Sequence, residues 1–152
     1  EHLYEAVTGR GVTLNGAHLP PVTESKDAGT TTWFADRSLR NHPHFTTFNA
    51  KFDIRFEGGA VMNILQLLTQ PTACYIKAPK KSLGGCAIWD LAAVALMLAE
   101  GGGIVRAYDG SPLSLNRPEG VFFNDVGLIL AGSSAAFDSV FAHLPAHSFD
   151  EN

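Results

Sequence analysis

Asp90 is the residue of this sequence best placed to do chemistry, because it lies in the first turn of a stretch that predicts a buried apolar helix. A helix N-terminus has unpaired N–H groups and a partial positive charge, which stabilise a carboxylate or a phosphate. A carboxylate at the end of a buried helix needs a partner, and a divalent cation with oxygen ligands, such as Mg²⁺, would suit it. The plain alternative is an acid that serves only the first turn of the helix.

A glycine-rich turn is the second candidate. Gly58-Gly59-Ala60 follows a stretch that alternates with period two, residues 51–56, and precedes one with helical spacing, residues 60–68. At such a strand-to-helix turn the backbone N–H groups are exposed and a ligand can approach them closely. The residues alone equally allow a tight turn without a ligand.

Three other motifs indicate structure rather than chemistry. Gly101-Gly102-Gly103 follows the helix and therefore predicts its C-terminal cap, not a phosphate loop. His42-Pro43-His44 has no third ligand at usable spacing and favours a loop over a zinc site. Ser133 is suited to be the N-cap of a closing helix, and no glycine elbow surrounds it as a nucleophile would require.

The elements that must position these residues alternate along the chain. We expect strands over residues 30–35, 51–56, 73–78, 104–108 and 126–131, and helices over 60–68, 88–100 and 133–143. This alternation predicts an α/β fold: a largely parallel or mixed sheet with helices on both faces.

A small β unit precedes this alternation. Asn15-Gly16 between apolar residues is a hairpin signal, because both positions of such a turn need positive φ. We therefore divide the chain into a β-hairpin segment, 1–21, a polar linker, 22–29, and an α/β domain, 30–152.

Composition excludes several classes of protein. The 152 residues are 45% hydrophobic and 17% charged, which is typical of one globular domain, and the net charge of −4 argues against a nucleic-acid polymer as partner. No signal peptide and no run long enough to span a bilayer is found. Cys74 and Cys86 have no metal-binding spacing and predict reduced thiols in a cytoplasmic protein, although two cysteines could pair.

The Asp90 segment also carries a family resemblance. Trp89-Asp90-Leu91-Ala92-Ala93, then Glu100 ten places after the aspartate, then two glycines, a strand and Asp109-Gly110, is similar to the C-terminal signature of the inositol monophosphatase superfamily. These are Mg-dependent phosphatases of inositol phosphates, sugar phosphates and 3',5'-bisphosphonucleotides. Residues 4–16 and 127–133 also resemble stretches of this superfamily, so the resemblance covers most of the chain in the right order.

The resemblance implies a metal-dependent phosphomonoesterase of which this chain is the C-terminal half. Asp90 would be a catalytic metal ligand for Mg²⁺. The other ligands would come from an N-terminal half with a Glu-Glu pair and an Asp-Pro-x-Asp-Gly-Thr loop. Neither motif occurs here, and Asp36, Asp53 and Asp109 lack that context. We therefore expect no catalysis by this chain alone, and the alternatives are a non-catalytic α/β regulatory domain or a phosphate-binding module unrelated to the family.

The resemblance also suggests substrate-binding residues. Gly58, Gly59 and Ala60 would contact sugar or inositol hydroxyls, although Gly59 replaces the usual Ser or Thr and loses its side-chain contact. In the loop before the helix, Lys81, together with Lys80, could meet a second phosphate as in the bisphosphate nucleotidase branch; a solvated charged loop is the alternative.

The expected partner is thus a phosphorylated small molecule. Leu83 stands where the inositol-specific branch tends to have a glutamate, which favours a 3'(2'),5'-bisphosphate nucleotide or a sugar phosphate over an inositol phosphate. Because dimers are common among relatives, the resemblance also suggests a homodimer.

Overall fold

The computed structural model describes residues 2–23 and 29–145 of the chain. Its first part is an antiparallel three-stranded sheet, β1 (Tyr4–Ala6), β2 (Val12–Leu14) and β3 (Ala17–His18). The predicted turn between β2 and β3 is confirmed, since Asn15 and Gly16 have φ of 52° and 79°. Most of the predicted linker, residues 24–28, lies outside the described residues.

The main sheet is mixed, as the alternation of elements predicted. Its strands are β4 (Thr32–Phe34), β5 (Asp53–Arg55), β6 (Ala73–Lys77), β7 (Ile104–Arg106) and β8 (Leu128–Ala131), in the order β5-β4-β6-β8-β7. Strand β4 runs parallel to β5 and β6, whereas β8 is antiparallel to β6 and β7. The carboxyl ends of β4, β5 and β6 therefore meet at one edge of the sheet.

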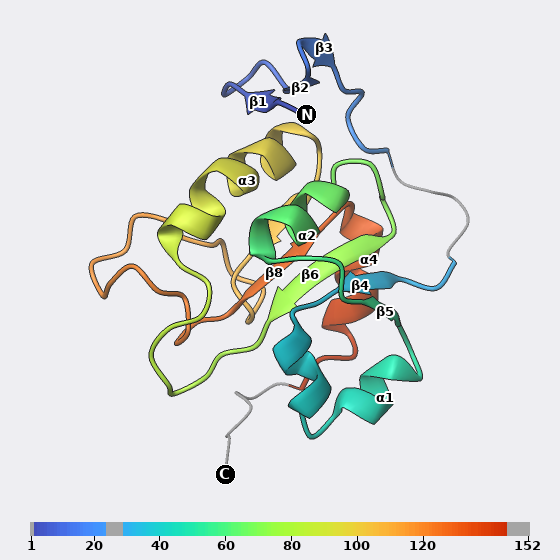
Figure 1. Cartoon of the computed structure of the whole chain (residues 1–152), viewed down its shortest axis with the longest axis vertical. Coiled ribbons are helices and arrows are strands. Elements are labelled where there is room, and N and C mark those ends of the chain that lie inside the picture. The colour runs from blue at the N-terminus through green and yellow to red at the C-terminus, as the bar shows by residue number, and fades with distance from the viewer. Residues whose placement is uncertain (1, 24–28, 146–152) are drawn as a thin grey trace.

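Helices cover both faces of this sheet, again as predicted (Figure 1). The elements are the 3₁₀ turn η1 (Arg37–Asn41) and the helices α1 (Phe45–Asn49), α2 (Ala60–Gln66), α3 (Ile88–Glu100) and α4 (Ser134–Phe141). Residues of α2 and α3 pack with Phe34 and Tyr75 in one core, and residues of α1 and α4 pack with Trp33 and Cys74 in the other. Successive side chains of β4 and β6 thus point to opposite faces of the sheet, which lies between the two cores.

Helix α3 begins and ends as its sequence predicts. Its buried residues Leu91, Val94, Ala95 and Leu98 recur at helical spacing and face the sheet. The chain leaves the helix through the glycine run, where Gly102 has φ of 89° as a left-handed C-terminal position requires. Among the described helices, none is long and apolar enough to cross a membrane.

The small sheet is fixed to the C-terminal end of α3. Both carboxylate oxygens of Glu100 accept hydrogen bonds from the turn between β1 and β2, at 2.9 Å from the Gly9 nitrogen and 3.0 Å from the Gly11 nitrogen. Val12 is buried against the same helix, and the Val22 nitrogen donates to the Gly101 carbonyl at 2.7 Å. Asp90 lies at the opposite end of α3, so this helix connects the small sheet to the carboxyl edge of the main sheet (Figure 1).

Candidate active site at the carboxyl edge of the sheet

A charged cluster lies where β4 and β6 end. The two strands are parallel with Phe34 opposite Tyr75, and because side chains alternate, the residues two places further, Asp36 and Lys77, face each other on the α3 side. The Asp36 carboxylate forms an ion pair with the Lys77 ammonium and accepts a hydrogen bond from the Tyr75 hydroxyl at 3.2 Å. We call Asp36, Tyr75 and Lys77 the strand-end cluster.

Electrostatics keep the tyrosine of this cluster protonated. Burial first, and then the negative charge of Asp36, raises the pKa of Tyr75 above its ordinary value. Tyr75 therefore remains a hydrogen-bond donor to Asp36 at neutral pH. Lys77 contacts the same carboxylate oxygen, Oδ2, so Asp36 is held by two donors and its charge is balanced within the cluster.

Asp90 lies close to this cluster. It is the third residue of α3, and its Oδ2 accepts a hydrogen bond from the Ala87 nitrogen at 2.9 Å, so the carboxylate is half-buried at the start of the helix. After burial, the charge of Asp90 is the next largest cause that raises the pKa of Cys86, to about 12. The same charge also contributes to the raised pKa of Tyr75. Asp90 is thus both a helix-capping acid and an electrostatic neighbour of the strand-end cluster.

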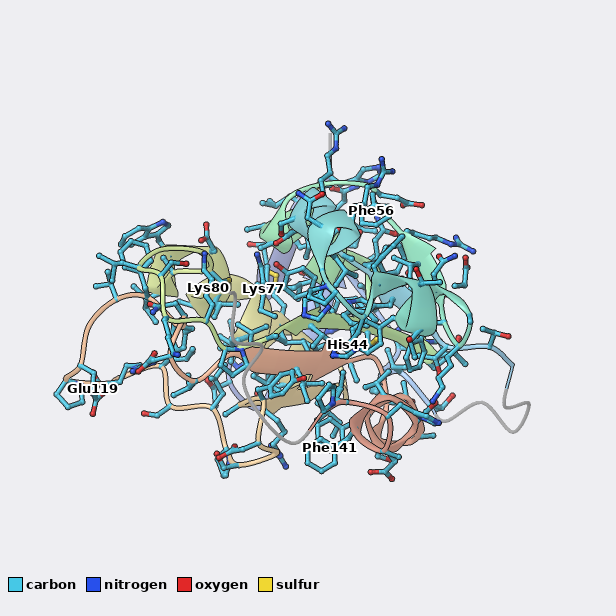
Figure 2. The ribbon with its side chains drawn as sticks, turned by 90° about the horizontal axis from the view of Figure 1, so that it is seen from below. His44, Phe56, Lys77, Lys80, Glu119 and Phe141 are labelled. Atoms are coloured by element: carbon cyan, nitrogen blue, oxygen red, sulfur yellow. The ribbon has the colours of Figure 1, made fainter. Side chains whose placement is uncertain are left out.

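A cavity of about 520 Å³ runs along this edge. Its lining includes Asp36 and Lys77 from the strand ends, Lys80 and Cys86 from the segment before α3, and Trp33 and Asn124. Figure 2 shows Lys77 and Lys80 projecting on the same side of the sheet. Asp90 is not part of this lining, but Cys86, which lines the cavity, directly precedes Ala87, whose nitrogen donates to the Asp90 carboxylate.

The predicted glycine turn borders the same edge but does not line the cavity. Gly59 is the N-cap of α2, and the buried Asn63 amide donates to the Gly58 carbonyl at 3.1 Å and to the Ala35 carbonyl at 3.5 Å. These bonds tie the turn formed by Gly58, Gly59 and Ala60 to the end of β4. Its backbone is therefore beside the residue that precedes Asp36.

The two adjacent lysines of the loop before α3, Lys80 and Lys81, have different surroundings. Lys80 lines the cavity, whereas the side chain of Lys81, the predicted phosphate contact, is exposed and is not part of the lining. Leu83, which stands at the position of a glutamate in some relatives, is 82% exposed. The chain thus brings Lys80, rather than Leu83, to the strand-end cluster.

The donors in this chain do not make a metal site by themselves. Within residues 2–23 and 29–145, no three side chains of His, Cys, Asp or Glu are grouped so that they could hold a metal ion. Asp90 offers a single carboxylate, and Asp36 is already neutralised by Lys77. The described residues therefore fit one ligand of a metal centre and not a centre built from several carboxylates.

Asp36, Tyr75 and Lys77 were not identified as a site from the sequence. Asp36 lacked a metal-loop context, and Tyr75 and Lys77 lay within an expected strand. One signal was present: a charged residue occupies the carboxyl end of each of two predicted strands, and such ends are where ligands bind in α/β sheets. The signal did not show that the two strands are neighbours.

Comparison with known proteins identifies the family to which this chain belongs. The sequence matches the profile described as the inositol monophosphatase family over residues 1–147. The chain belongs to this family, and its fold matches the C-terminal half of the family fold, as the Asp90 segment predicted. No protein among those with curated functions matches it significantly.

Solved structures agree with this assignment of the fold. Staphylococcal inositol monophosphatase II bound to 2'AMP has a TM-score of 0.68 and 18% identity, over 94% of this chain and 53% of that one. Its complex with inositol monophosphate has a TM-score of 0.72 and 17% identity, over 93% and 52%. Inositol monophosphatase from Anabaena has a TM-score of 0.68 and 19% identity, over 96% and 56%. The chain therefore spans about half the length of these relatives.

Proposed function

We propose that this chain is the C-terminal half of a metal-dependent phosphomonoesterase, to which it contributes Asp90 as a catalytic metal ligand. The observation that carries the proposal is the position of the Asp90 carboxylate. It is half-buried at the start of α3, four residues after Cys86, which lines a cavity at the carboxyl edge of a parallel strand pair. The family membership supports phosphatase chemistry. The chain spans half the length of its relatives, which supports the view that an N-terminal half supplies the remaining ligands.

The metal we propose is Mg²⁺, because it binds carboxylate oxygens together with phosphate oxygens. When bound, such an ion supplies charge stabilisation to phosphate transfer. The work of the described residues is to bind and orient the substrate. The strand-end cluster and the N–H groups around Gly58, Gly59 and Ala60 would hold the part of the substrate that bears hydroxyls, and Asp90 would face its phosphate.

The proposed substrate is a phosphorylated small molecule: a 3'(2'),5'-bisphosphate nucleotide, a sugar phosphate or an inositol phosphate. The cavity volume, about 520 Å³, is in the range of small-molecule sites. The staphylococcal relative binds 2'AMP and inositol monophosphate, which supports both nucleotide and polyol skeletons. For the complete protein we also propose a homodimer located in the cytoplasm.

A non-catalytic phosphate-binding or regulatory domain is the second candidate. It is favoured by one observation, that the described residues supply only one carboxylate to a metal centre. In this case the fold and the cavity would persist without turnover. The two candidates differ in whether the complete protein is an enzyme. Sequencing the gene upstream of the codon for Glu1 would show whether it encodes the Glu-Glu pair and the Asp-Pro-x-Asp-Gly-Thr loop that a metal centre would need.

Phosphate release by the complete protein tests the proposal. Release from phosphomonoesters should require Mg²⁺ and should stop when a chelator is added. The 152-residue chain alone should release no phosphate above background under the same conditions. Phosphate release by the isolated chain, or none by a folded complete protein on all three substrate classes, would refute the proposed function.

A further inference from the structure

We propose that Arg117 is a positioning residue for Asp90, and that it acts through residues 121–124, which support the entrance to α3. The proposal rests on the proposed function, because a fixed Asp90 carboxylate matters for its role as a metal ligand. Arg117 lies in the loop between β7 and β8 and is not part of the cavity lining. It is therefore a residue that neither the Asp90 segment nor the cavity identifies.

The start of α3 depends on contacts from outside the helix. Its N-cap is Ala87, whose side chain has no hydrogen-bonding group, and the cap is instead the Asp90 bond to the Ala87 nitrogen at 2.9 Å. The preceding residues 78–87, all within the described chain, form neither a helix nor a strand, and Gly84 and Gly85 have φ of 97° and 107°. Such a segment is ordered only where other contacts offset its loss of conformational entropy. What this segment packs on thus sets the position of Ala87 and of the Asp90 carboxylate.

Residues 121–124 provide that support. Backbone hydrogen bonds join them to the segment before Asp90: the Phe123 nitrogen to the Cys86 carbonyl at 3.0 Å, the Ile88 nitrogen to the Val121 carbonyl at 2.8 Å, and the Lys80 nitrogen to the Asn124 carbonyl at 2.6 Å. Between these bonds, Ala87 and Phe122 form an antiparallel bridge. The loop that contains residues 121–124, orange in Figure 1, accordingly runs beside the start of α3.

Arg117 fixes the conformation of this support. Its guanidinium forms a forked ion pair with the Asp125 carboxylate, with 2.8 Å between Nη1 and Oδ1 and a second bond from Nη2. Nη1 also donates to the Phe122 carbonyl at 3.4 Å, and the guanidinium carbon lies over the Phe123 ring, 5.5 Å from its centroid. A planar guanidinium can make these contacts together, whereas a lysine ammonium has no fork and no flat face.

Phe123 extends this restraint into the core. It is 2% exposed and belongs to the same core cluster as Cys86 and as Leu91, the residue after Asp90. Arg117 is therefore connected to Asp90 by backbone pairing and by side-chain packing. The ion pair itself should add little to global stability, because the Asp125 side chain is 50% exposed. Loss of Arg117 should thus disturb the entrance to α3 more than the fold.

Amide hydrogen exchange in the complete protein, followed by NMR, tests this connection without metal or substrate. We expect Arg117→Ala to speed exchange of the Ala87 amide by about tenfold, which corresponds to the loss of one hydrogen bond. Amides of the β6–β8 pair should exchange at an unchanged rate. The matched control is Arg55→Ala, which removes the exposed ion pair with Asp53 and should change neither rate. If Arg117→Ala does not fold, Arg117→Lys should show a smaller increase at Ala87 alone.

Metal binding provides a second readout. In calorimetric titration of the complete protein, Arg117→Ala should bind Mg²⁺ about tenfold more weakly, at the lower end of the effect of outer partners of metal ligands. Arg55→Ala should bind Mg²⁺ as the unmodified protein does. The thermal midpoint without metal should change little in either variant.

Three results would overturn the proposal. Unchanged exchange of Ala87 in Arg117→Ala would show that the two residues are not connected. Faster exchange of the β6–β8 amides by the same factor would show a role in global stability alone. Unchanged Mg²⁺ binding in a protein that requires Mg²⁺ for phosphate release would show that Arg117 does not position the metal ligand. Failure of the proposed function is seen separately, as absence of Mg²⁺-dependent phosphate release by the unmodified protein.

Discussion

At the scale of single residues, the site depends on charges that are satisfied before any ligand binds. Lys77 and Tyr75 both donate to Asp36, so this carboxylate is neither a spare metal ligand nor an unpaired buried charge. Asp90 differs, because its only described bond is to the backbone at the start of its own helix. For this reason we propose Asp90, and not Asp36, as the metal ligand.

Both cysteines of the chain, Cys74 and Cys86, should be chemically inert. Burial raises the pKa of the Cys74 thiol well above its ordinary value, and burial with the Asp90 charge raises that of Cys86 to about 12. Thiolate is the reactive form, and at pH 8 only roughly one Cys86 in ten thousand would carry it. Neither thiol should react with Ellman's reagent in native buffer, and both should react in denaturant. Rapid labelling of the native protein would contradict the described burial.

At this scale the sequence predicted one candidate residue of the site, Asp90, but not the Asp36–Lys77 ion pair. Asp90 could be selected because the signals that mark it, an apolar helix and its first turn, are local. The pairing of Asp36 with Lys77 could not be selected, because it depends on β4 and β6 being neighbours in a particular register. That register joins residues forty-one places apart and follows from packing of the whole sheet.

At the scale of elements, α3 connects the two parts of the described chain. Its last residue is an acid, Glu100, although negative charge is unfavourable at a helix C-terminus. The N–H groups of Gly9 and Gly11 compensate for this, and both glycines have φ of 74°, a conformation that directs successive N–H groups to one anion. Glu100 thus fixes the small sheet to the helix that carries Asp90.

Substitution of Glu100 should show a pH-dependent loss of stability. The hydrogen bonds from Gly9 and Gly11 lower the pKa of Glu100 below 4.5, so its contribution is complete above about pH 4.5 and is lost as the pH falls through the lower folded value. We expect Glu100→Gln to unfold at lower urea concentration than the unmodified chain at pH 7, and the two midpoints to converge towards pH 3.

The matched control for this change is Glu57→Gln, at an exposed glutamate in the turn after β5. Its midpoint should follow that of the unmodified chain at both pH values. A Glu100→Gln midpoint that is equally reduced at pH 7 and pH 3 would show that the ionised carboxylate is not the stabilising form.

Elements were predicted most accurately where local signals define their ends. The limits of α3 are the predicted ones, because an acid at its start and glycines at its end are both local features. The closing helix begins after its predicted N-cap, since the Ser133 hydroxyl accepts from the Ala136 nitrogen at 3.2 Å. Strands β5 and β7 are shorter than expected, because an alternating pattern shows which side chains are buried but not where pairing stops.

At the scale of the whole molecule, the chain corresponds to about half the length of related structures, and we propose that it is half of a larger protein. Its cavity lies at the carboxyl edge of the main sheet, and the segment before α3 that helps to line it leads to Asp90. The mixed sheet with helices on both faces follows from the order of the elements and could be predicted. The sequence could not predict which side chains would line the cavity, because the fold brings them together from the ends of β4 and β6 and the loop before α3.

The most direct measurement is phosphate release by the complete protein with Asp90 replaced by asparagine. Asparagine can still accept the Ala87 bond, so the helix should persist and the thermal midpoint should change little. Loss of a charged metal ligand should nevertheless lower kcat by on the order of a hundredfold or more. Asp53→Asn, at the exposed end of β5, should keep full activity. Unchanged turnover in a folded Asp90→Asn protein would contradict the role proposed for Asp90.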